Sequence, residues 1–247
     1  MLFESLHHLE SKPGRLLMFP RQWSVNKAID ETRYSNERAL LYKARTEYRA
    51  KLVPITQDSF TKHLEFNQTQ YSRVLTLDSD SVVRQHMDEL FTLPSAPVAM
   101  PCAYRLPAQL SSQLILIEPS AREWHRRDFD MEIVNALCKE SCIVLPHRRY
   151  DLLAGEFRSE RHEAYLGSEE EGWNPDKVFA EAKFVHFSNY PHPKLWIAAS
   201  EQQTRGVWPK CKGADGMEVV VGCREREIWL RIYRNFRERR GDVCGKR

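Results

Sequence analysis

The sequence predicts an α/β domain with a mainly parallel sheet that is covered by helices on both faces. Short apolar runs of strand type alternate with segments of helical periodicity, and this alternation is typical of parallel sheets. The chain has 247 residues, of which 42% are hydrophobic and 11% aromatic, so it can bury a substantial core. We therefore expect one large domain, alone or with an appendage.

The first third of the chain is expected to alternate helix and strand three times. Apolar residues near the start fall at helical spacing, and a second apolar stripe follows Ser35. Each helix precedes a short apolar run, and the last run, Val74 to Leu77, is interpreted as a fully buried strand. The expected elements are a helix near 2–9, a strand over 15–19, a helix from 35, a strand over 51–55, a helix over about 58–69 and a strand over 74–77.

The remaining chain continues the alternation and then loses its periodicity. The stretch 167–174 is acidic with Gly and Ser, which indicates an exposed loop, and 198–223 is expected to be irregular. A final helix is expected from about Glu225, with apolar residues on one face and basic residues on the other. The other expected elements are strands at 98–100, 113–117 and 142–145, and helical patterns at 86–91 and 129–137.

The charge of the chain is nearly balanced except at its C-terminal end. There are 37 Lys and Arg against 34 Asp and Glu, a surplus too small to indicate a nucleic-acid or membrane partner. Residues 224–247 carry nine basic and four acidic side chains, interspersed with Trp229, Tyr233 and Phe236. Aromatic residues among arginines can stack on bases, but their helical spacing favours packing of the helix on the domain. We expect no nucleic-acid partner.

Neither a membrane-spanning segment nor a secretory signal is predicted from the sequence as given. No run approaches the roughly 18 apolar residues that a span requires, and charge follows the first apolar residues. The six cysteines show no paired CxxC spacing, so they are expected to be free or buried thiols. Cys211 and Cys223 flank a Gly-rich turn, and a disulfide between them in an oxidising compartment is the less favoured alternative.

Asp78 and Asp80 follow the strand at 74–77, at the edge of the sheet where open α/β folds bind their ligands. In extended backbone, residues two apart point the same way, so both carboxylates can meet one hard divalent cation while Ser79 turns aside. Such a cation would offset the charge on a departing diphosphate. The alternative is that Asp-Ser-Asp-Ser is a solvated turn, and the spacing alone does not decide between them.

Further motifs accompany the aspartates in a fixed order. The segment Asp58-Ser59-Phe60-Thr61-Lys62 precedes them, and Phe129-Asp130-Met131-Glu132-Ile133-Val134-Asn135, His186-Phe187-Ser188 and Pro193-Lys194-Leu195-Trp196 follow. This arrangement resembles the glycogenin-like family 8 glycosyltransferases, most closely the fungal N-acetylglucosaminyltransferase branch that is often labelled glucose N-acetyltransferase. The resemblance runs from about Leu6 to the tail.

The resemblance implies a GT-A-type nucleotide-diphospho-sugar transferase fold. The family opens with a short strand that cradles the nucleotide, whereas this chain begins inside the helix that should follow, so the first strand is expected to be lacking. The implied catalytic domain is 1–197, N-terminally incomplete, followed by an irregular segment at 198–223 and a basic C-terminal helix and tail at 224–247.

The resemblance also implies roles for individual residues. Asp78, Asp80 and His186 would ligate Mn²⁺ (or Mg²⁺), while Lys62 and Lys194 would bind the donor and its diphosphate. Ser112 and Gln113 occupy the place where the family lines the donor sugar. Asp130 would bind sugar hydroxyls and Glu132 would face the reacting carbon. Met131 and Leu195 depart from the pattern, which usually has an amide and a proline at these positions.

The implied function is a metal-dependent, retaining transfer of N-acetylglucosamine or another hexose from a UDP-sugar to a glycan or glycoprotein acceptor, in the Golgi lumen. The principal alternative is a catalytically degenerate relative that acts as a carbohydrate-binding or complex-forming protein. A second alternative is hydrolysis by Asp78 paired with Asp130 or Glu132, whose separation the sequence does not fix.

Overall fold

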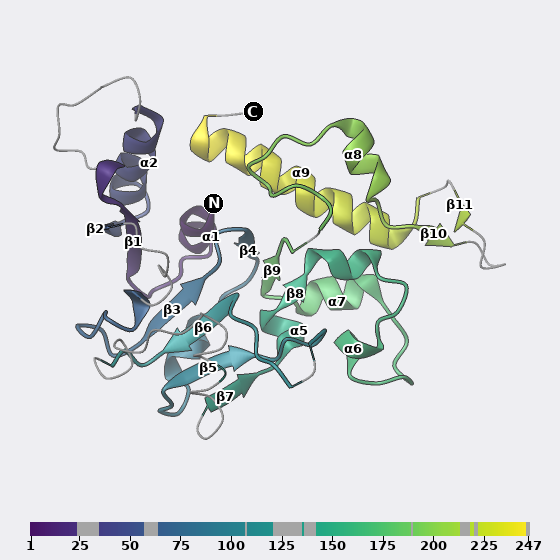
Figure 1. The fold of residues 1–247 in the computed structure, drawn as a ribbon, viewed down its shortest axis with the longest axis horizontal. Helices are drawn as coiled ribbons and strands as arrows, with labels where there is room; N and C mark the ends of the chain where they lie inside the picture. Colours follow the sequence, from purple (N-terminus) through teal and green to yellow (C-terminus); the bar gives the residue numbers. More distant parts are fainter. Residues whose placement is uncertain are drawn as a thin grey trace.

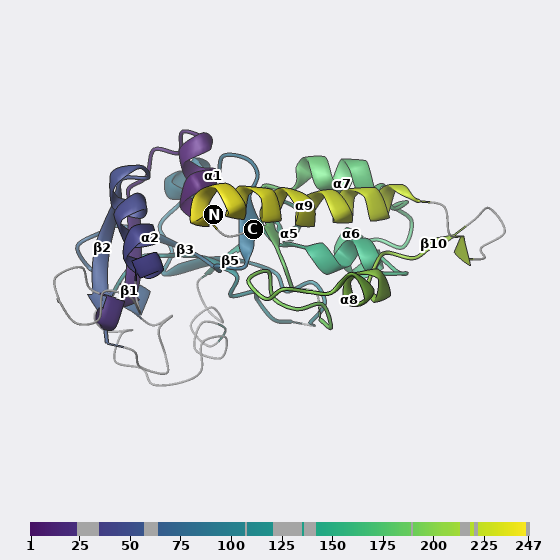
Figure 2. The ribbon, with the colours of Figure 1, turned by 90° about the horizontal axis from the view of Figure 1, so that it is seen from above.

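The computed structural model describes residues 1–23, 35–56, 64–106, 108–120, 135, 142–188, 190–212, 218–219 and 222–245. Within these residues the fold is α/β, as expected, but its sheets are mixed and not mainly parallel. Figure 1 shows a small β-layer with one helix at one end, a central sheet, and a helical region at the other end. The last helix runs along one side of the molecule between these ends (Figures 1 and 2).

The central sheet has four strands in the order β3-β6-β5-β7. Their bounds are β3 Val74–Leu77, β5 Val98–Pro101, β6 Leu114–Ile117 and β7 Cys142–Leu145. All residues of β5 and β6 are buried, since these strands are paired on both sides. The expectation that β3 is fully buried was wrong: its four residues are half-buried, and among the described residues this strand pairs only with β6.

The antiparallel pairing of β5 with β6 explains why the sheet is mixed. Within the segment between them, a bridge joins Cys102 to Leu110, and the Ala103 N–H donates to the Gln109 carbonyl at 2.9 Å. The chain therefore turns back in a hairpin here, whereas a parallel pair would need a long crossover. Only the pairing of β5 with β7 in this sheet is parallel.

A separate parallel pair forms the N-terminal layer, as expected from the sequence. Helix α1 spans Leu2–His8, and α2, Ser35–Thr46, precedes the second strand of the pair. The strands are β1 Arg15–Pro20 and β2 Ala50–Ile55, with a short 3-10 helix η1 at Arg21–Trp23. The helix expected over 58–69 lies partly outside the described residues, and 64–69 form a short 3-10 segment and turns instead of an α-helix.

A third sheet carries part of the candidate site. Its order is β4-β9-β8, with β4 Ser81–Val83, β8 Leu152–Leu153 and β9 Phe184–His186. The surrounding helices are η3 Asp88–Thr92, α5 His147–Tyr150, η4 Ala154–Arg158, α6 Glu163–Leu166 and α7 Pro175–Glu181. The helical pattern expected at 86–91 is thus a 3-10 helix, and the expected loop at 167–174 is confirmed. The pattern at 129–137 lies outside the described residues except for Asn135.

Helix α9, Arg224–Cys244, closes the core of the C-terminal half. Its apolar stripe is buried against η4, α7 and β9, in a cluster that also contains Leu152, Phe157 and Phe187. The stripe consists of Ile228, Trp229, Ile232, Tyr233 and Phe236. These aromatic rings are therefore packed in the core, as their helical spacing predicted, and are not available to stack on bases.

The segment 198–223 is more regular than expected. Ser200 begins helix α8, Glu201–Gly206, with a capping box in which Ser200 and Gln203 exchange hydrogen bonds. A short hairpin, β10 Cys211–Lys212 with β11 Glu218–Val219, follows. The Ser-x-x-Gln spacing is typical of a helix start. The segment has no long apolar stripe, so the sequence did not predict this helix.

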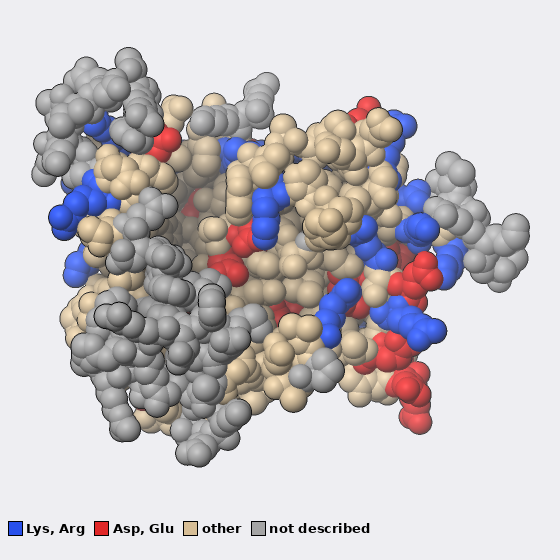
Figure 3. Space-filling view, viewed as in Figure 1, with Lys and Arg blue, Asp and Glu red and all other residues tan. Residues whose placement is uncertain are grey.

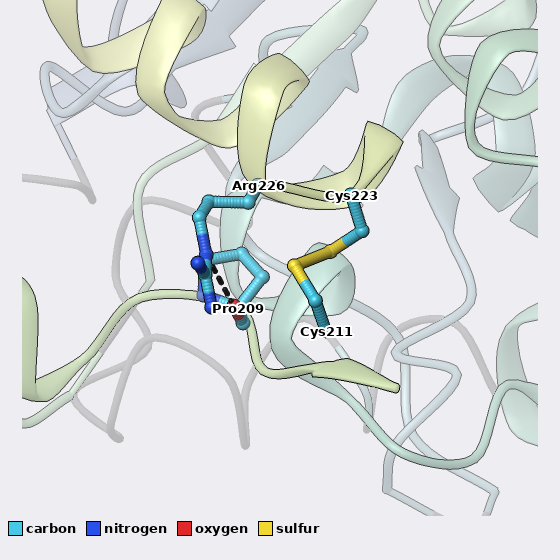
Figure 4. Close-up of a disulfide and its surroundings, with 4 residues drawn as sticks. All are labelled: Pro209, Cys211, Cys223 and Arg226. Carbon is cyan, nitrogen blue, oxygen red and sulfur yellow. Dashed lines mark hydrogen bonds between the residues drawn. A yellow bond between two sulfur atoms is a disulfide. The ribbon is translucent and has the colours of Figure 1, made fainter. Parts of the chain in front are cut away.

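A disulfide joins Cys211 to Cys223, which corrects the expectation of free thiols for this pair (Figure 4). The hairpin brings the two Cα atoms to 5.4 Å, within the range that a disulfide requires. The bond ties β10 to the start of α9, and Arg226 Nε donates to the Pro209 carbonyl at 3.0 Å beside it. The thiols of Cys102, Cys142 and Cys244 are not in disulfides, and Cys138 lies outside the described residues. None of the helices in the described part of the chain is both long and apolar enough to cross a bilayer.

Candidate active site

Residues Asp78 to Asp80 link the central sheet to the third sheet, between the end of β3 and the start of β4. The Asp78 N–H donates to the Gln113 carbonyl at 2.9 Å, and the Ser81 hydroxyl donates to the Asp78 carbonyl. The Asp80 carbonyl accepts a hydrogen bond from the Phe187 N–H at 2.9 Å. Backbone contacts to both sheets therefore fix the positions from which the two carboxylates project.

His186 meets both carboxylates because β9 pairs with β4. In that antiparallel ladder Ser81 lies opposite His186, which places the imidazole next to Asp80. His186 Nε2 lies 3.1 Å from Asp80 Oδ1 and 3.7 Å from Asp78 Oδ2. Asp80 is 6% exposed and His186 is 5% exposed. The structure thus brings together three side chains that are far apart in sequence.

Lys194 completes the group from the segment after β9. Its Nζ donates to Asp80 Oδ2, while His186 occupies the other carboxylate oxygen. Burial of Asp80 favours its neutral form, but the hydrogen bonds from His186 and Lys194 outweigh burial and hold the pKa of Asp80 well below its usual value. Asp80 is therefore a carboxylate, the form that a metal ligand requires.

The donor set fits a divalent cation that accepts oxygen and nitrogen ligands. One ligand atom from each of Asp78, Asp80 and His186 lies within 4.8 Å of the other two. Carboxylates suit Mg²⁺ and Mn²⁺, and a single imidazole favours the transition metal of the two. His186 turns Nε2 toward the carboxylates, and its buried Nδ1 has no hydrogen-bond partner among the described residues. A tautomer with its proton on Nδ1 would leave the Nε2 lone pair facing the two acids.

Two of the other candidate residues lie beside this group, and three cannot be placed. Ser112 and Gln113 precede β6, whose first residue Leu114 pairs with Leu77 at the end of β3. Ser112 is buried, and the side-chain Oε1 of Gln113 is buried with no hydrogen-bond partner in the described chain. Lys62, Asp130 and Glu132 lie outside the described residues.

Asp151 is a neighbour of the group that sequence reasoning missed. It follows α5 and is 2% exposed. Burial raises the pKa of Asp151 well above its usual value, a hydrogen bond from Ser111 opposes this, and the nearby charge of Asp78 adds to it. An acidic residue between the apolar Tyr150 and Leu152 was the signal that could have identified it.

A cavity of about 740 Å³ opens beside Ser79. Strands β1 and β3 form two of its walls, and Trp196 contributes to another. Its lining is mainly apolar, with basic side chains that include Arg15, Lys51 and Arg240. Figure 3 shows acidic side chains within a hollow on the face drawn there, next to a basic side chain. The volume lies within the range of pockets that hold nucleotide-sized ligands, roughly 300–1,000 Å³.

Comparison with known proteins identifies close fungal relatives. No protein-family model matches the sequence. The chain is 46% identical over 273 residues to glucose N-acetyltransferase 1 of Gibberella zeae, which covers 99% of this chain and 58% of the relative. It is 41% identical over 283 residues to glucose N-acetyltransferase 1 of Aspergillus fumigatus, which covers all of this chain and 73% of the relative. The chain thus spans 58% and 73% of the length of these two relatives.

A solved structure shares the fold. The glycosyltransferase GlyE of Streptococcus pneumoniae superposes with a TM-score of 0.50 over 94% of this chain and 57% of GlyE. The sequence identity is 14%, so the likeness concerns the fold alone. It agrees with the GT-A type of α/β fold that the sequence resemblance implied.

Proposed function

This chain belongs to the fungal glucose N-acetyltransferase 1 family of glycosyltransferases, and on that premise we propose that it transfers N-acetylglucosamine or another hexose from a UDP-sugar to a glycan acceptor. We propose further that the transfer needs a divalent cation, Mn²⁺ or Mg²⁺, and retains the configuration of the sugar. The name that the relatives share, glucose N-acetyltransferase 1, refers to glucose and to an N-acetyl group, which supports this class of donor.

One observation carries the proposal: two carboxylates, an imidazole and an ammonium group converge beside a cavity large enough for a nucleotide. Asp78, Asp80 and His186 offer ligand atoms within 4.8 Å of one another. Lys194 donates to Asp80, and Ser79 lines the cavity. Asp78, Asp80 and His186 would hold the cation, Lys194 would bind the diphosphate, and the cavity would take the nucleoside.

The residues of the chain would contribute mainly position and charge. A bound cation would act as a Lewis acid on the diphosphate. Lys194 holds Asp80 in the structure, and a cation on Asp80 would compete with it, so the freed ammonium group would turn to the diphosphate. Ser112 and Gln113 lie beside Asp78 and would line the donor sugar. Asp130 would bind sugar hydroxyls and Glu132 would face the reacting carbon. The acceptor hydroxyl would attack from the face that the diphosphate leaves, with the leaving phosphate as the base.

The disulfide supports a location in an oxidising compartment. Disulfides such as Cys211–Cys223 form in the secretory pathway and are rare where thiols are kept reduced. We therefore propose the Golgi lumen as the site of action.

Calorimetry of UDP-sugar binding tests the proposal directly. We expect heat of binding for UDP-N-acetylglucosamine with Mn²⁺ and none with a chelator present. Asp80→Asn should abolish the metal-dependent part, whereas Glu169→Gln, which removes one exposed acid from the loop at 167–174, should leave it intact. Binding that is unchanged by Asp80→Asn would refute the metal site.

The alternative is a degenerate relative that binds carbohydrate without transferring it. One observation favours it: Lys194 and His186 each contact a different oxygen of Asp80, so groups of the protein itself already satisfy this carboxylate. In that case glycans would bind while Mn²⁺ and the UDP-sugar would not, and the same titrations distinguish the two functions.

A further inference from the structure

We propose that the ring of Tyr190 is a stacking platform for a pyranose ring of the acceptor, placed outside the donor cavity. This inference rests on the proposed transferase function and extends it to a residue that binds the acceptor. It arises from the loop between β9 and α8, which extends toward one edge of the molecule in Figure 2.

Large apolar side chains are exposed on this loop more densely than elsewhere. Seven large hydrophobic residues in the described chain are exposed, and three of them, Tyr190, Trp196 and Ile197, fall within eight residues. Tyr190 is 94% exposed, the highest value among them. This density along one loop distinguishes it from the single exposed apolar residues that are normal on a protein surface.

The exposure of Tyr190 is not a consequence of a loosely held segment. Before Tyr190 in the chain, the Phe187 N–H donates a hydrogen bond to the Asp80 carbonyl. The Phe187 ring packs edge-on against the Tyr233 ring, with 5.1 Å between the ring centroids. After Tyr190, the His192 ring packs edge-on against Tyr233 at 4.9 Å. The Tyr190 carbonyl itself accepts a hydrogen bond from Arg158 at 3.5 Å. The backbone is thus held to α9 and η4 on both sides of a ring that remains in solvent.

The loop also starts and ends at the candidate metal group. His186 contacts Asp80 at one end, and Lys194 contacts the same carboxylate at the other. Tyr190 is four residues from each, and four extended residues span at most about 14 Å. A pyranose ring is roughly a third of that length. The ring of Tyr190 is therefore close enough to contact one of the first two sugar units of a glycan bound at the site.

The position of Tyr190 outside the donor cavity favours contact with the acceptor. Trp196 and Ser79 line the donor cavity, and Tyr190 does not. Tyrosine combines a flat apolar face with a hydroxyl, which suits a sugar ring that has C–H bonds on one face and hydroxyls at its edge. A solvent-exposed aromatic platform beside a charged reaction centre would orient an acceptor hydroxyl without competing for the cation.

Ligand-detected NMR tests the platform on the full chain. Saturation-transfer spectra would be recorded with diamagnetic Mg²⁺ and UDP present, with methyl glucoside, methyl mannoside and methyl N-acetylglucosaminide as probes. We expect saturation of the C–H face of at least one glycoside in the wild type and in Tyr190→Phe, and at least a tenfold weaker affinity in Tyr190→Ala. Tyr42→Ala removes another exposed tyrosine, on α2, and should change nothing.

The outcomes separate this inference from the transferase assignment. Loss of glycoside binding in Tyr190→Ala, with calorimetric Mn²⁺-dependent UDP binding intact, supports the platform. Equal glycoside binding in Tyr190→Ala and the wild type, or no saturation in the wild type, overturns it even if UDP binds. Absence of Mn²⁺-dependent UDP binding refutes the proposed function independently of any glycoside signal.

Discussion

At the scale of residues, Asp80 decides between the two interpretations of the Asp-Ser-Asp segment. A solvated turn would leave its acids in water, whereas the Asp80 carboxylate is almost completely buried and accepts hydrogen bonds from an imidazole and an ammonium group. Ser79 between the two acids is exposed, as expected for alternate side chains of an extended segment. The alternation was predictable from the sequence, but the buried partners were not.

Removal of the Lys194 ammonium group is predicted to change the affinities for the metal and for the nucleotide in opposite directions. Lys194→Met removes a competitor for Asp80, so the affinity for Mn²⁺ alone should rise. The affinity for UDP in the presence of Mn²⁺ should fall about 10- to 100-fold, because a charge-assisted hydrogen bond contributes about 1.5–3 kcal/mol. Titration calorimetry with each ligand measures both effects, and Lys210→Met provides an exposed control. A parallel decrease of both affinities would contradict the exchange of Lys194 between Asp80 and the diphosphate.

Glu156 is predicted to make stability depend on acid pH. It is buried, and although burial opposes its charge, hydrogen bonds from His162 and Arg105 hold the pKa of Glu156 below its usual value. A carboxyl whose pKa is lowered on folding stabilises the fold above its unfolded pKa, about 4.3, and loses that contribution as pH falls through the folded pKa. The free energy of unfolding should therefore fall less steeply below that pH in Glu156→Gln than in the wild type.

Urea denaturation of both proteins across this range measures the difference. At neutral pH, Glu156→Gln should already be less stable by about 1–3 kcal/mol, because the buried pairing with Arg105 and His162 is weakened. Identical acid slopes for the two proteins would show that Glu156 does not change its pKa on folding.

At the scale of elements, the sequence was most informative where a strand coincides with a short apolar run. β1, β2, β3, β5, β6 and β7 all occur where apolar runs predicted them. Pairing direction was not predictable, because the hairpin between β5 and β6 depends on contacts such as Cys102 with Leu110 and not on composition. The same applies to the site: His186 was placed by resemblance, and only the register of β4 with β9 explains its contact with Asp80.

The hairpin and α9 are predicted to depend on their disulfide. The Cys211–Cys223 bond closes a loop with a sequence separation of 12. Restricting the unfolded chain by a loop of this size stabilises a fold by about 3 kcal/mol. Double substitution of both cysteines by Ala should lower the free energy of unfolding by that amount, and Cys244→Ala should leave it nearly unchanged. Equal stability of the wild type under oxidising and reducing conditions would argue against the bond.

At the scale of the whole molecule, α9 connects parts that are distant in sequence. Arg239 near its C-terminal end donates to the Glu4 carboxylate and, at 2.7 Å, to the Ser5 hydroxyl on α1. Arg240 donates to the Leu195 carbonyl at 3.3 Å, next to Lys194. Trp229, in the N-terminal half of the same helix, is buried in the core. The basic face of α9, which carried the charge surplus in the sequence, therefore includes cations that hold both α1 and the Lys194 loop.

This arrangement predicts that the chain unfolds as one unit. Trp229 is fully buried, and its ring packs against Tyr233 and His192. Trp229→Ala should lower the free energy of unfolding by about 3–5 kcal/mol through the cavity it leaves. Circular dichroism in urea should show a single transition at a lower midpoint with an unchanged slope. Leu106→Ala, at an exposed position, is the control.

Hydrogen exchange of the β6 amides extends this prediction to the central sheet. β6 is buried and paired on both sides, and its Leu114 and Leu116 belong to a different core cluster from Trp229. If the ion pair of α9 with α1 and the third sheet couple the two clusters, Trp229→Ala should lower the protection free energy of the β6 amides by the same amount that circular dichroism records. Exchange of the β6 amides that is unaffected by Trp229→Ala, or a second transition in urea, would show instead that the C-terminal half opens on its own. The Lys194 loop packs on α9, so in that case the candidate site would be lost while the central sheet remained folded.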